Sequence, residues 1–280
     1  MEEMGAHVII ISRNGEDHYG NLDRHADSSI IVNATPVGMY PHTGVSPLDL
    51  SLFPRLEGVL DMIYNPSRTT LLLDAAERGL VVENGLWMLV AQAKEAAEWF
   101  TGTAMDDSVI AAIHNTLRVQ MENIILIGMP GCGKSTIADM LAKKLNRKCV
   151  DADGEIVELA GKSIPEIFAQ DGELEFRRIE TQALMQLGMM SGLIIATGGG
   201  CVTQERNYPL LHQNGTIFWL ERDLNALPTD GRPLSQANKL TDMYKIRKPM
   251  YERFADHRID NNGSPEETVA QILAKLEESP

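Results

Sequence analysis

Residues 124–136 read Ile-Ile-Leu-Ile-Gly-Met-Pro-Gly-Cys-Gly-Lys-Ser-Thr, and this stretch decides the fold. Ile124 to Ile127 is a short apolar run rich in β-branched residues, which is typical of a buried parallel strand. Gly128 to Ser135 then matches the pattern G-x-x-x-x-G-K-S/T at every fixed position, and a helix-compatible stretch follows. The sequence therefore predicts a P-loop, placed between a strand and a helix.

The predicted loop has the chemistry of a phosphate-binding site. Its glycines, Gly128, Gly131 and Gly133, let successive backbone N–H groups converge on phosphate oxygens, and the N-terminus of the next helix adds positive potential. We expect Lys134 to bring a full charge to the transferring phosphate and Ser135 to bring an oxygen ligand to Mg²⁺. These residues, with Thr136, form the predicted nucleotide-binding set.

The composition limits the class of protein. A chain of 280 residues with 44% hydrophobic residues is long enough for two globular domains. The net charge of −14 argues against a nucleic-acid surface, because such a surface needs a basic stripe. We see no signal peptide and no membrane-spanning stretch, and the three cysteines show no metal-binding spacing, so we expect a cytoplasmic protein with reduced thiols.

The first part of the chain has an α/β texture. Apolar runs predict strands at His7–Ile11, Ser29–Asn33 and Gly58–Met62, and helical periodicity marks residues 67–78 and 85–100. A last helix is expected over residues 109–117. We therefore predict two α/β domains, 1–118 and 119–280: a partial Rossmann-like domain, then a P-loop domain with a central parallel sheet flanked by helices.

Three motifs of the first part resemble the C-terminal half of shikimate dehydrogenase. They are Asn33-Ala-Thr-Pro-Val-Gly-Met39, Asp61-Met-Ile-Tyr-Asn-Pro66 and Gly85-Leu-Trp-Met-Leu-Val-Ala-Gln92. The resemblance implies that Arg13 lies where that family holds the NADP 2′-phosphate and that Gln92 lies near shikimate. It also implies positions beside the cofactor or the reaction centre for Thr35, Gly38, Met39 and Tyr64.

The first part also departs from that family. The substrate domain with its catalytic lysine and aspartate is missing, and residues 1–6 leave no room for the glycine-rich turn after the first Rossmann strand. A dinucleotide site without that turn lacks its main anion contact. We therefore expect neither NADP binding nor dehydrogenase activity from this chain.

Two carboxylates follow the next short apolar run of the second part. Asp151 and Asp153 are spaced i and i+2 after a predicted strand, which places them on one side of it. Beside a phosphate loop they suit Mg²⁺ coordination and the handling of a substrate hydroxyl. The alternative is that they cap the helix predicted over Gly154–Leu159.

Arg177 and Arg178 are adjacent on a predicted helix, so they face different directions. One of them is expected to pair locally with Glu173 or Glu180, and the other to reach a ligand carboxylate with two hydrogen bonds. Upstream, Ser163 and Glu166 have the spacing of a capping box and open a further helix.

Three glycines, Gly198–Gly200, follow the apolar run 193–196 at the end where open α/β sheets bind ligands. They allow close backbone approach and offer N–H donors. The polar segment 221–235, which contains Arg232, is a candidate lid. Arg247 follows on a further helical segment.

The ordered set of motifs in residues 121–280 resembles shikimate kinase. The set comprises the P-loop, Asp151-x-Asp153, Phe176-Arg-Arg-Ile-Glu180, Gly198-Gly-Gly200, Arg232-Pro-Leu234 and Arg247-x-Pro-x-Tyr251. The resemblance implies transfer of a phosphoryl group from ATP to the 3-hydroxyl of shikimate, with Mg²⁺ as the metal. ATP and shikimate are the implied partners, and the oligomeric state stays open.

The resemblance also implies a role for each residue. Lys134, Asp153 and Arg232 would be catalytic, and Ser135 and Asp151 would hold Mg²⁺. The shikimate contacts would come from Asp153, Arg177, Gly199, Gly200 and Arg247.

Two departures concern the nucleotide. The family usually places a further arginine before its Arg-Pro-Leu, whereas residues 225–229 offer none, and 261–263 lack the basic residue often found near adenine. These departures affect ATP affinity or closure rather than the reaction class. The alternatives are another P-loop small-molecule kinase, such as a gluconate or nucleotide kinase, and a non-catalytic nucleotide-binding module.

Overall fold

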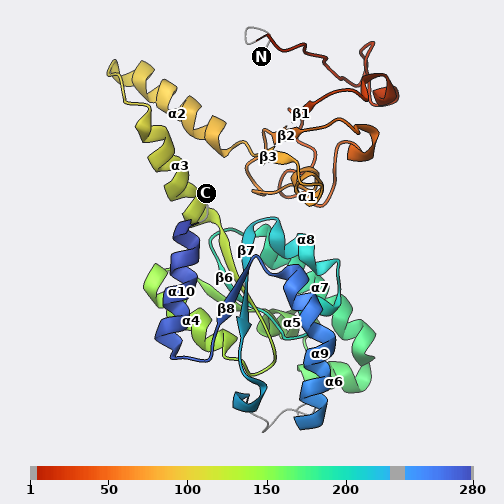
Figure 1. Cartoon of the computed structure of the whole chain (residues 1–280), viewed down its shortest axis with the longest axis vertical. Coiled ribbons are helices and arrows are strands. Elements are labelled where there is room, and N and C mark those ends of the chain that lie inside the picture. Colours follow the sequence, from red (N-terminus) through yellow and green to blue (C-terminus); the bar gives the residue numbers. More distant parts are fainter. Residues whose placement is uncertain (1–4, 228–236, 279–280) are drawn as a thin grey trace. The chain divides into compact units, whose positions relative to one another are not determined.

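The computed structural model describes residues 5–227 and 237–278, and the chain divides into two compact units, Met1–Gly102 and Thr103–Pro280 (Figure 1). The domain boundary expected after residue 118 falls inside helix α3 (Ser108–Met121). Only Glu122 separates α3 from strand β4 (Asn123–Ile127), which explains why α3 belongs to the second unit.

The first unit is built on a three-stranded parallel sheet with the order β1-β2-β3. Helix α1 packs on this sheet through Leu71, Leu72 and Ala75, which share one apolar core with Val59 of β2. The elements of the unit are η2 (Leu22–His25), β1 (Ile30–Asn33), η3 (Leu50–Leu52), β2 (Gly58–Asp61), α1 (Thr70–Glu77), β3 (Val81–Glu83) and α2 (Leu86–Thr101).

In the first unit one strand prediction is wrong, and one strand of the structure was not predicted. Residues His7–Ile11 form no strand. Within the described residues β1 pairs only with β2, so the apolar run ahead of it does not join the free edge of β1. Val81–Glu83 does form a strand, because it pairs with β2 in parallel although it is only three residues long.

The second unit is built on a five-stranded parallel sheet with the order β5-β6-β4-β7-β8. β4 is central, and Ile124, Ile125, Leu126 and Ile127 are completely buried, as the apolar run predicts. The other strands are β5 (Cys149–Asp151), β6 (Ile194–Ala196), β7 (Gly215–Glu221) and β8 (His257–Asp260).

Helices cover both faces of this sheet (Figure 1). α4 and α10 pack together on one face, whereas α7, α8 and α9 lie on the other. The helices are α4 (Lys134–Leu145), α5 (Ala152–Ala160), α6 (Ile164–Gln170), α7 (Gly172–Met189), η4 (Cys201–Thr203), α8 (Asn207–His212), η5 (Leu224–Ala226), α9 (Ala237–Phe254) and α10 (Pro265–Glu278).

The predicted α/β class, with parallel sheets flanked by helices, is confirmed. The topology places the site, because the carboxyl ends of parallel strands meet at one edge of the sheet. At this edge the P-loop follows β4, Asp151 ends β5 and Thr197 follows β6.

Candidate active site

The P-loop has the backbone that its glycines allow. Gly128, Gly131 and Gly133 have φ angles of 148°, 82° and 101°, in the region that side chains rarely adopt. A Cβ on Gly128 would lie 2.6 Å from the carbonyl oxygen of Leu220, so the loop passes directly against β7. Lys134 is buried and donates hydrogen bonds to the carbonyls of Gly128 and Met129, at 3.0 and 3.1 Å. Its ammonium group therefore lies across the phosphate-binding loop.

Asp151 links the P-loop to the end of β5. The hydroxyl of Ser135 donates to one carboxylate oxygen of Asp151 at 3.2 Å, and the backbone N–H of Asp153 donates to the other at 3.0 Å. Asp151 is therefore both the helix cap of α5 and the neighbour of the P-loop serine, so the two interpretations left open by the sequence coexist.

Asp153 belongs to the first turn of α5, not to the strand side on which we expected it together with Asp151. A helix begins between the two residues, so strand alternation does not set the direction of Asp153. Its carboxylate points toward the glycine loop after β6, where a Cβ on Gly198 would lie 2.7 Å from its Oδ1.

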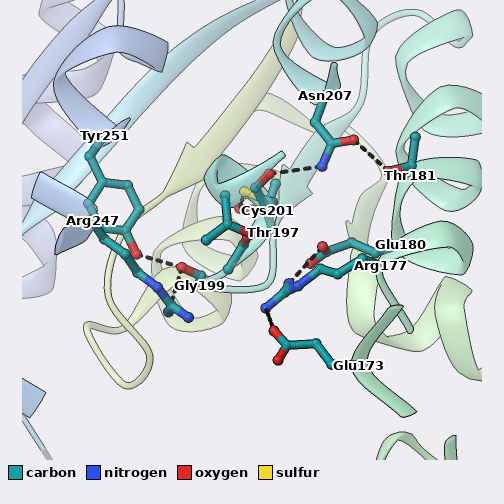
Figure 2. A network of polar contacts seen from close by, with 12 residues as sticks. Glu173, Arg177, Glu180, Thr181, Thr197, Gly199, Cys201, Asn207, Arg247 and Tyr251 are labelled. Carbon is teal, nitrogen blue, oxygen red and sulfur yellow. Dashed lines mark hydrogen bonds and ion pairs between the residues drawn. The ribbon is translucent and has the colours of Figure 1, made fainter. Parts of the chain in front are cut away.

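Arg177 enters the site from α7 with two acidic partners (Figure 2). Its guanidinium donates to Glu180 at 2.8 Å and to Glu173 at 3.3 Å. Arg178 is exposed and pairs with Glu175 at 2.7 Å instead. Arg177 is therefore the arginine that pairs with Glu173 and Glu180 as expected, and Arg178 has a local partner as well, because the helix spacing gives each of them a glutamate three residues away.

Burial raises the pKa of Glu180, whose side chain is 2% exposed, and the nearby positive charge of Arg177 opposes that shift. Removing either partner would leave the other charge buried and uncompensated, which is strongly destabilising. Glu180 therefore holds Arg177 in the cavity. The helical spacing predicted Glu180 as a partner for one of the two arginines, but nothing in the sequence indicated its burial.

The glycine loop after β6 is held from α9. Arg247 and Tyr251 both donate to the carbonyl of Gly199, at 3.0 and 2.6 Å (Figure 2). A Cβ on Gly200 would lie 2.6 Å from the guanidinium nitrogens of Arg177, so a side chain there would displace the guanidinium. Figure 2 shows Arg177 and Arg247 on either side of this loop.

A second set of hydrogen bonds fixes the residues around the glycines (Figure 2). Thr197 donates to the carbonyl of Leu126 at 2.9 Å, and Asn207 donates to the carbonyl of Cys201 at 2.8 Å. Thr181 of α7 in turn donates to Asn207 at 2.8 Å. Burial raises the pKa of the Cys201 thiol to about 12, so this cysteine stays protonated and acts as packing.

These groups surround one cavity of about 620 Å³. The predicted site residues that line it are Gly131, Gly133, Lys134, Ser135, Thr136, Asp151, Asp153, Arg177, Gly199, Gly200 and Arg247. Gly128 lies outside the lining, at the end of β4. Arg232 lies outside the described residues, as does most of the candidate lid.

The cavity also has an apolar side that we did not predict. Its members are Ile164, Phe168, Phe176, Leu240 and Met243. They come from α6, α7 and α9, and their spacing along the chain does not distinguish them from ordinary core residues. The cavity thus combines an apolar side with charged groups of both signs, three cations and three carboxylates, which suits a small polar ring compound that carries an anionic group.

The dehydrogenase-like motifs of the first unit form a different kind of cluster. Buried Asp61 accepts hydrogen bonds from Asn33 at 3.0 Å and from Thr69 at 2.7 Å, and Thr35 donates to Asn33 at 2.7 Å. Burial raises the pKa of Asp61, and these hydrogen bonds oppose the shift. The cluster ties the loops after β1 and β2 together.

In the described part of the chain no helix is long and apolar enough to cross a membrane.

A shikimate kinase family profile matches residues 130–277. The shikimate kinase of Synechococcus sp. strain RCC307 is 42% identical over 171 residues, which cover 57% of this chain and 86% of that protein. The solved structure of a shikimate kinase from Acinetobacter baumannii in complex with shikimate aligns with a TM-score of 0.53 and 35% identity, over 58% of this chain and 96% of its own.

A shikimate dehydrogenase structure from Peptoclostridium difficile aligns with 38% of this chain and 43% of its own, at 36% identity. Its TM-score is 0.36, which is too low to assign the first unit.

Proposed function

The chain belongs to the shikimate kinase family, its activity is the ATP-dependent phosphorylation of shikimate, and we propose that the 620 Å³ cavity is where the transfer takes place. The acceptor in this proposal is the 3-hydroxyl, and the products are shikimate 3-phosphate and ADP. Phosphoryl transfer depends mainly on positioning and on stabilising charge. The residues of the cavity are assigned to those tasks.

The nucleotide phosphates are held by the P-loop. The N–H groups of the loop and the start of α4 face the β- and γ-phosphates, with Gly131, Gly133 and Thr136 lining the cavity. Lys134 already lies across the loop, so its charge meets the γ-phosphate as negative charge develops during transfer.

Mg²⁺ fits beside Ser135 and Asp151, whose oxygens are 3.2 Å apart. Hydroxyl and carboxylate oxygens are ligands that Mg²⁺ accepts, and the ion usually takes its other ligands from phosphates and water. When bound, it would neutralise charge on the β- and γ-phosphates. Asp151 would hold it through water.

The acceptor lies between α5, α7 and the glycine loop. Asp153 hydrogen-bonds the attacking hydroxyl and takes its proton as the P–O bond forms. Arg177 and Arg247 bind the shikimate carboxylate, and the backbone of Gly199 and Gly200 contacts the ring. Arg232, outside the described residues, is assigned to neutralising charge during transfer.

One observation carries this assignment. Arg177 and Arg247, from two different helices, flank the same glycine loop in the cavity that also contains Lys134 and Asp153. A P-loop alone indicates only a nucleotide, whereas two arginines facing the loop select an acceptor with a carboxylate.

A coupled assay of ADP release tests the function, with shikimate, gluconate and a nucleoside monophosphate offered as acceptors. Shikimate is expected to stimulate ADP release and the other two are not. ADP release that depends on gluconate or on the nucleotide would replace the assignment with another kinase. A chain that binds ATP but releases no ADP with any acceptor would be a non-catalytic module.

For the first unit, we infer a non-catalytic remnant of a shikimate dehydrogenase C-terminal half. The three sequence motifs support it, together with the parallel sheet whose strand ends carry Asn33 and Asp61. Incubation with shikimate and NADP is expected to yield no NADPH, and NADPH formation would overturn the inference. We also propose a cytoplasmic location, consistent with Cys132, Cys149 and Cys201, which are all free thiols.

A further inference from the structure

The position of the acceptor cavity determines on which side of the P-loop the rest of the nucleotide lies. The acceptor cavity is lined from the β5 and β6 side of β4, by Asp151, Asp153 and the glycines after β6. The terminal phosphate faces that side during transfer, so the rest of the nucleotide extends the other way, over the ends of β7 and β8. This placement rests on the proposed function.

Arg222 stands on that other side. It directly follows β7, which pairs with β4 in parallel up to Ile127 and Trp219. A Cβ on Gly133, the glycine before α4, would lie 3.8 Å from Nη1 of Arg222. The guanidinium is therefore a neighbour of the P-loop on the β7 side of β4, whereas the glycine loop lies on the β6 side.

The charge of Arg222 has no protein partner in the part of the chain that the structure describes. Its side chain is half-buried, its Nε is buried without a hydrogen-bond partner, and no ion pair there includes it. The N-terminus of α4 and the ammonium group of Lys134 add positive potential nearby. Three sources of positive potential at one loop repel one another unless an anion binds between them.

The wall around Arg222 is fixed. Asn261, at the end of β8, is 4% exposed; its amide nitrogen donates to the carbonyl of Cys132 in the P-loop, and its oxygen accepts from Thr268 at 2.8 Å. A Cβ on Gly133 would also lie 3.7 Å from the Asn261 nitrogen. The Cys132 carbonyl is thus held by Asn261, and the guanidinium faces a rigid part of the loop.

We propose that Arg222 binds the α- and β-phosphates of the nucleotide from the side opposite the acceptor, as a nucleotide-binding residue of this kinase. It supplies, directly after β7, a cation that residues 225–229 do not supply. The hydrogen bonds that it donates are charge-assisted, and the terminal N–H groups of a guanidinium suit phosphate oxygens.

Arg222→Gln, which removes the charge and keeps a similar length, tests the proposal in the full chain. The matched control is Arg206→Gln, an exposed arginine at the start of α8 in the same unit. Calorimetry should show an approximately tenfold higher Kd for ADP with Mg²⁺ in the first variant, which is about 1.4 kcal/mol. The control variant, the melting temperature and shikimate binding should be unchanged.

Adenosine, followed by ligand-observed NMR, separates phosphate contact from base contact. Its affinity should be the same in wild type and Arg222→Gln. An unchanged Kd for ADP, or an equal loss for adenosine and ADP, would overturn the proposal while leaving the kinase function intact. A wild-type chain that binds no ADP would overturn both.

Discussion

Lys134 is the residue whose charge we propose to meet the transferring phosphate. Its ammonium group lies 3.0 Å from the carbonyl oxygen of Gly128, the first residue of the loop. A cation there stabilises the transition state more than it stabilises bound acceptor.

The first prediction follows from that difference. Lys134→Met should lower kcat by about 10²–10³-fold, because one preorganised electrostatic contact is lost at the transferring group. The KM for shikimate should change less than about threefold, because the acceptor contacts are untouched. Lys144→Met, on the exposed side of the same helix, is the control in steady-state assays. A rise in KM without a fall in kcat would contradict the role.

Arg177 and Arg178 provide a matched pair for the second prediction. Arg177→Gln should raise the Kd for shikimate by about 100-fold, since a bidentate carboxylate contact is lost. Arg178→Gln should leave it unchanged, because Arg178 is exposed and pairs with Glu175. Titration calorimetry measures both, with ADP binding as the folding control. Equal losses in the two variants would show that Arg177 does not bind the carboxylate.

At the level of elements, most of the second unit could be predicted from the sequence. Local chemistry alone predicts a strand at Ile124–Ile127, the P-loop after it, and a helix that begins at the capping residue Ser163. In the structure Glu166 accepts a hydrogen bond from the Ser163 N–H at 2.8 Å, as the capping box requires. Local signals succeed here because each element carries its own start or stop residue.

The failures have a physical cause in common. His7–Ile11 has strand composition but no strand beside it, and Val81–Glu83 has little local signal but a partner in β2. A strand forms only when another strand pairs with it, and the local sequence does not predict which segments pair. Likewise, Tyr251 supports the cavity and Phe168 lines it through contacts between elements.

The packing of α7 on α8 leads to the third prediction. A Cβ on Gly188 would lie 1.8 Å from the carbonyl oxygen of Leu210, so Gly188→Ala forces the two helices apart. The free energy of unfolding should fall by about 2–3 kcal/mol, as for other overpacked sites. Chemical denaturation measures this change.

Gly154→Ala is the control for the helix effect. Gly154 lies within α5 with nothing within 4 Å of its added Cβ, so the substitution should stabilise the chain by about 0.5–1 kcal/mol. If both variants shift stability in the same direction, the close approach of α7 and α8 is not what limits residue 188.

At the scale of the molecule, the P-loop unit has an apolar core of its own and begins with α3. The carbonyls of Val119, in the last turn of α3, and of Glu122, which follows α3, accept hydrogen bonds from Arg147 beyond α4. The length and composition indicated two domains, but they could not place the boundary, because composition does not show which unit α3 packs with.

The fourth prediction places the boundary by truncation. A chain of residues 103–280 should keep shikimate-dependent ADP release and the melting temperature of the P-loop unit. A chain of residues 119–280 should melt about 3 °C lower, since it loses the helix that presents the Val119 carbonyl, a loss of about 1 kcal/mol. Calorimetric scans compare them, and equal melting temperatures would favour a boundary near residue 118.

The central claim is that one cavity brings the terminal phosphate of ATP to a hydroxyl of shikimate. Phosphorus NMR of the full chain with ATP, Mg²⁺ and shikimate tests this claim most directly. We predict that the γ-phosphate signal is replaced, in step with ADP, by a phosphomonoester that couples to the proton on carbon 3 of shikimate. A spectrum in which only inorganic phosphate accumulates, or in which ATP stays intact, would contradict the account.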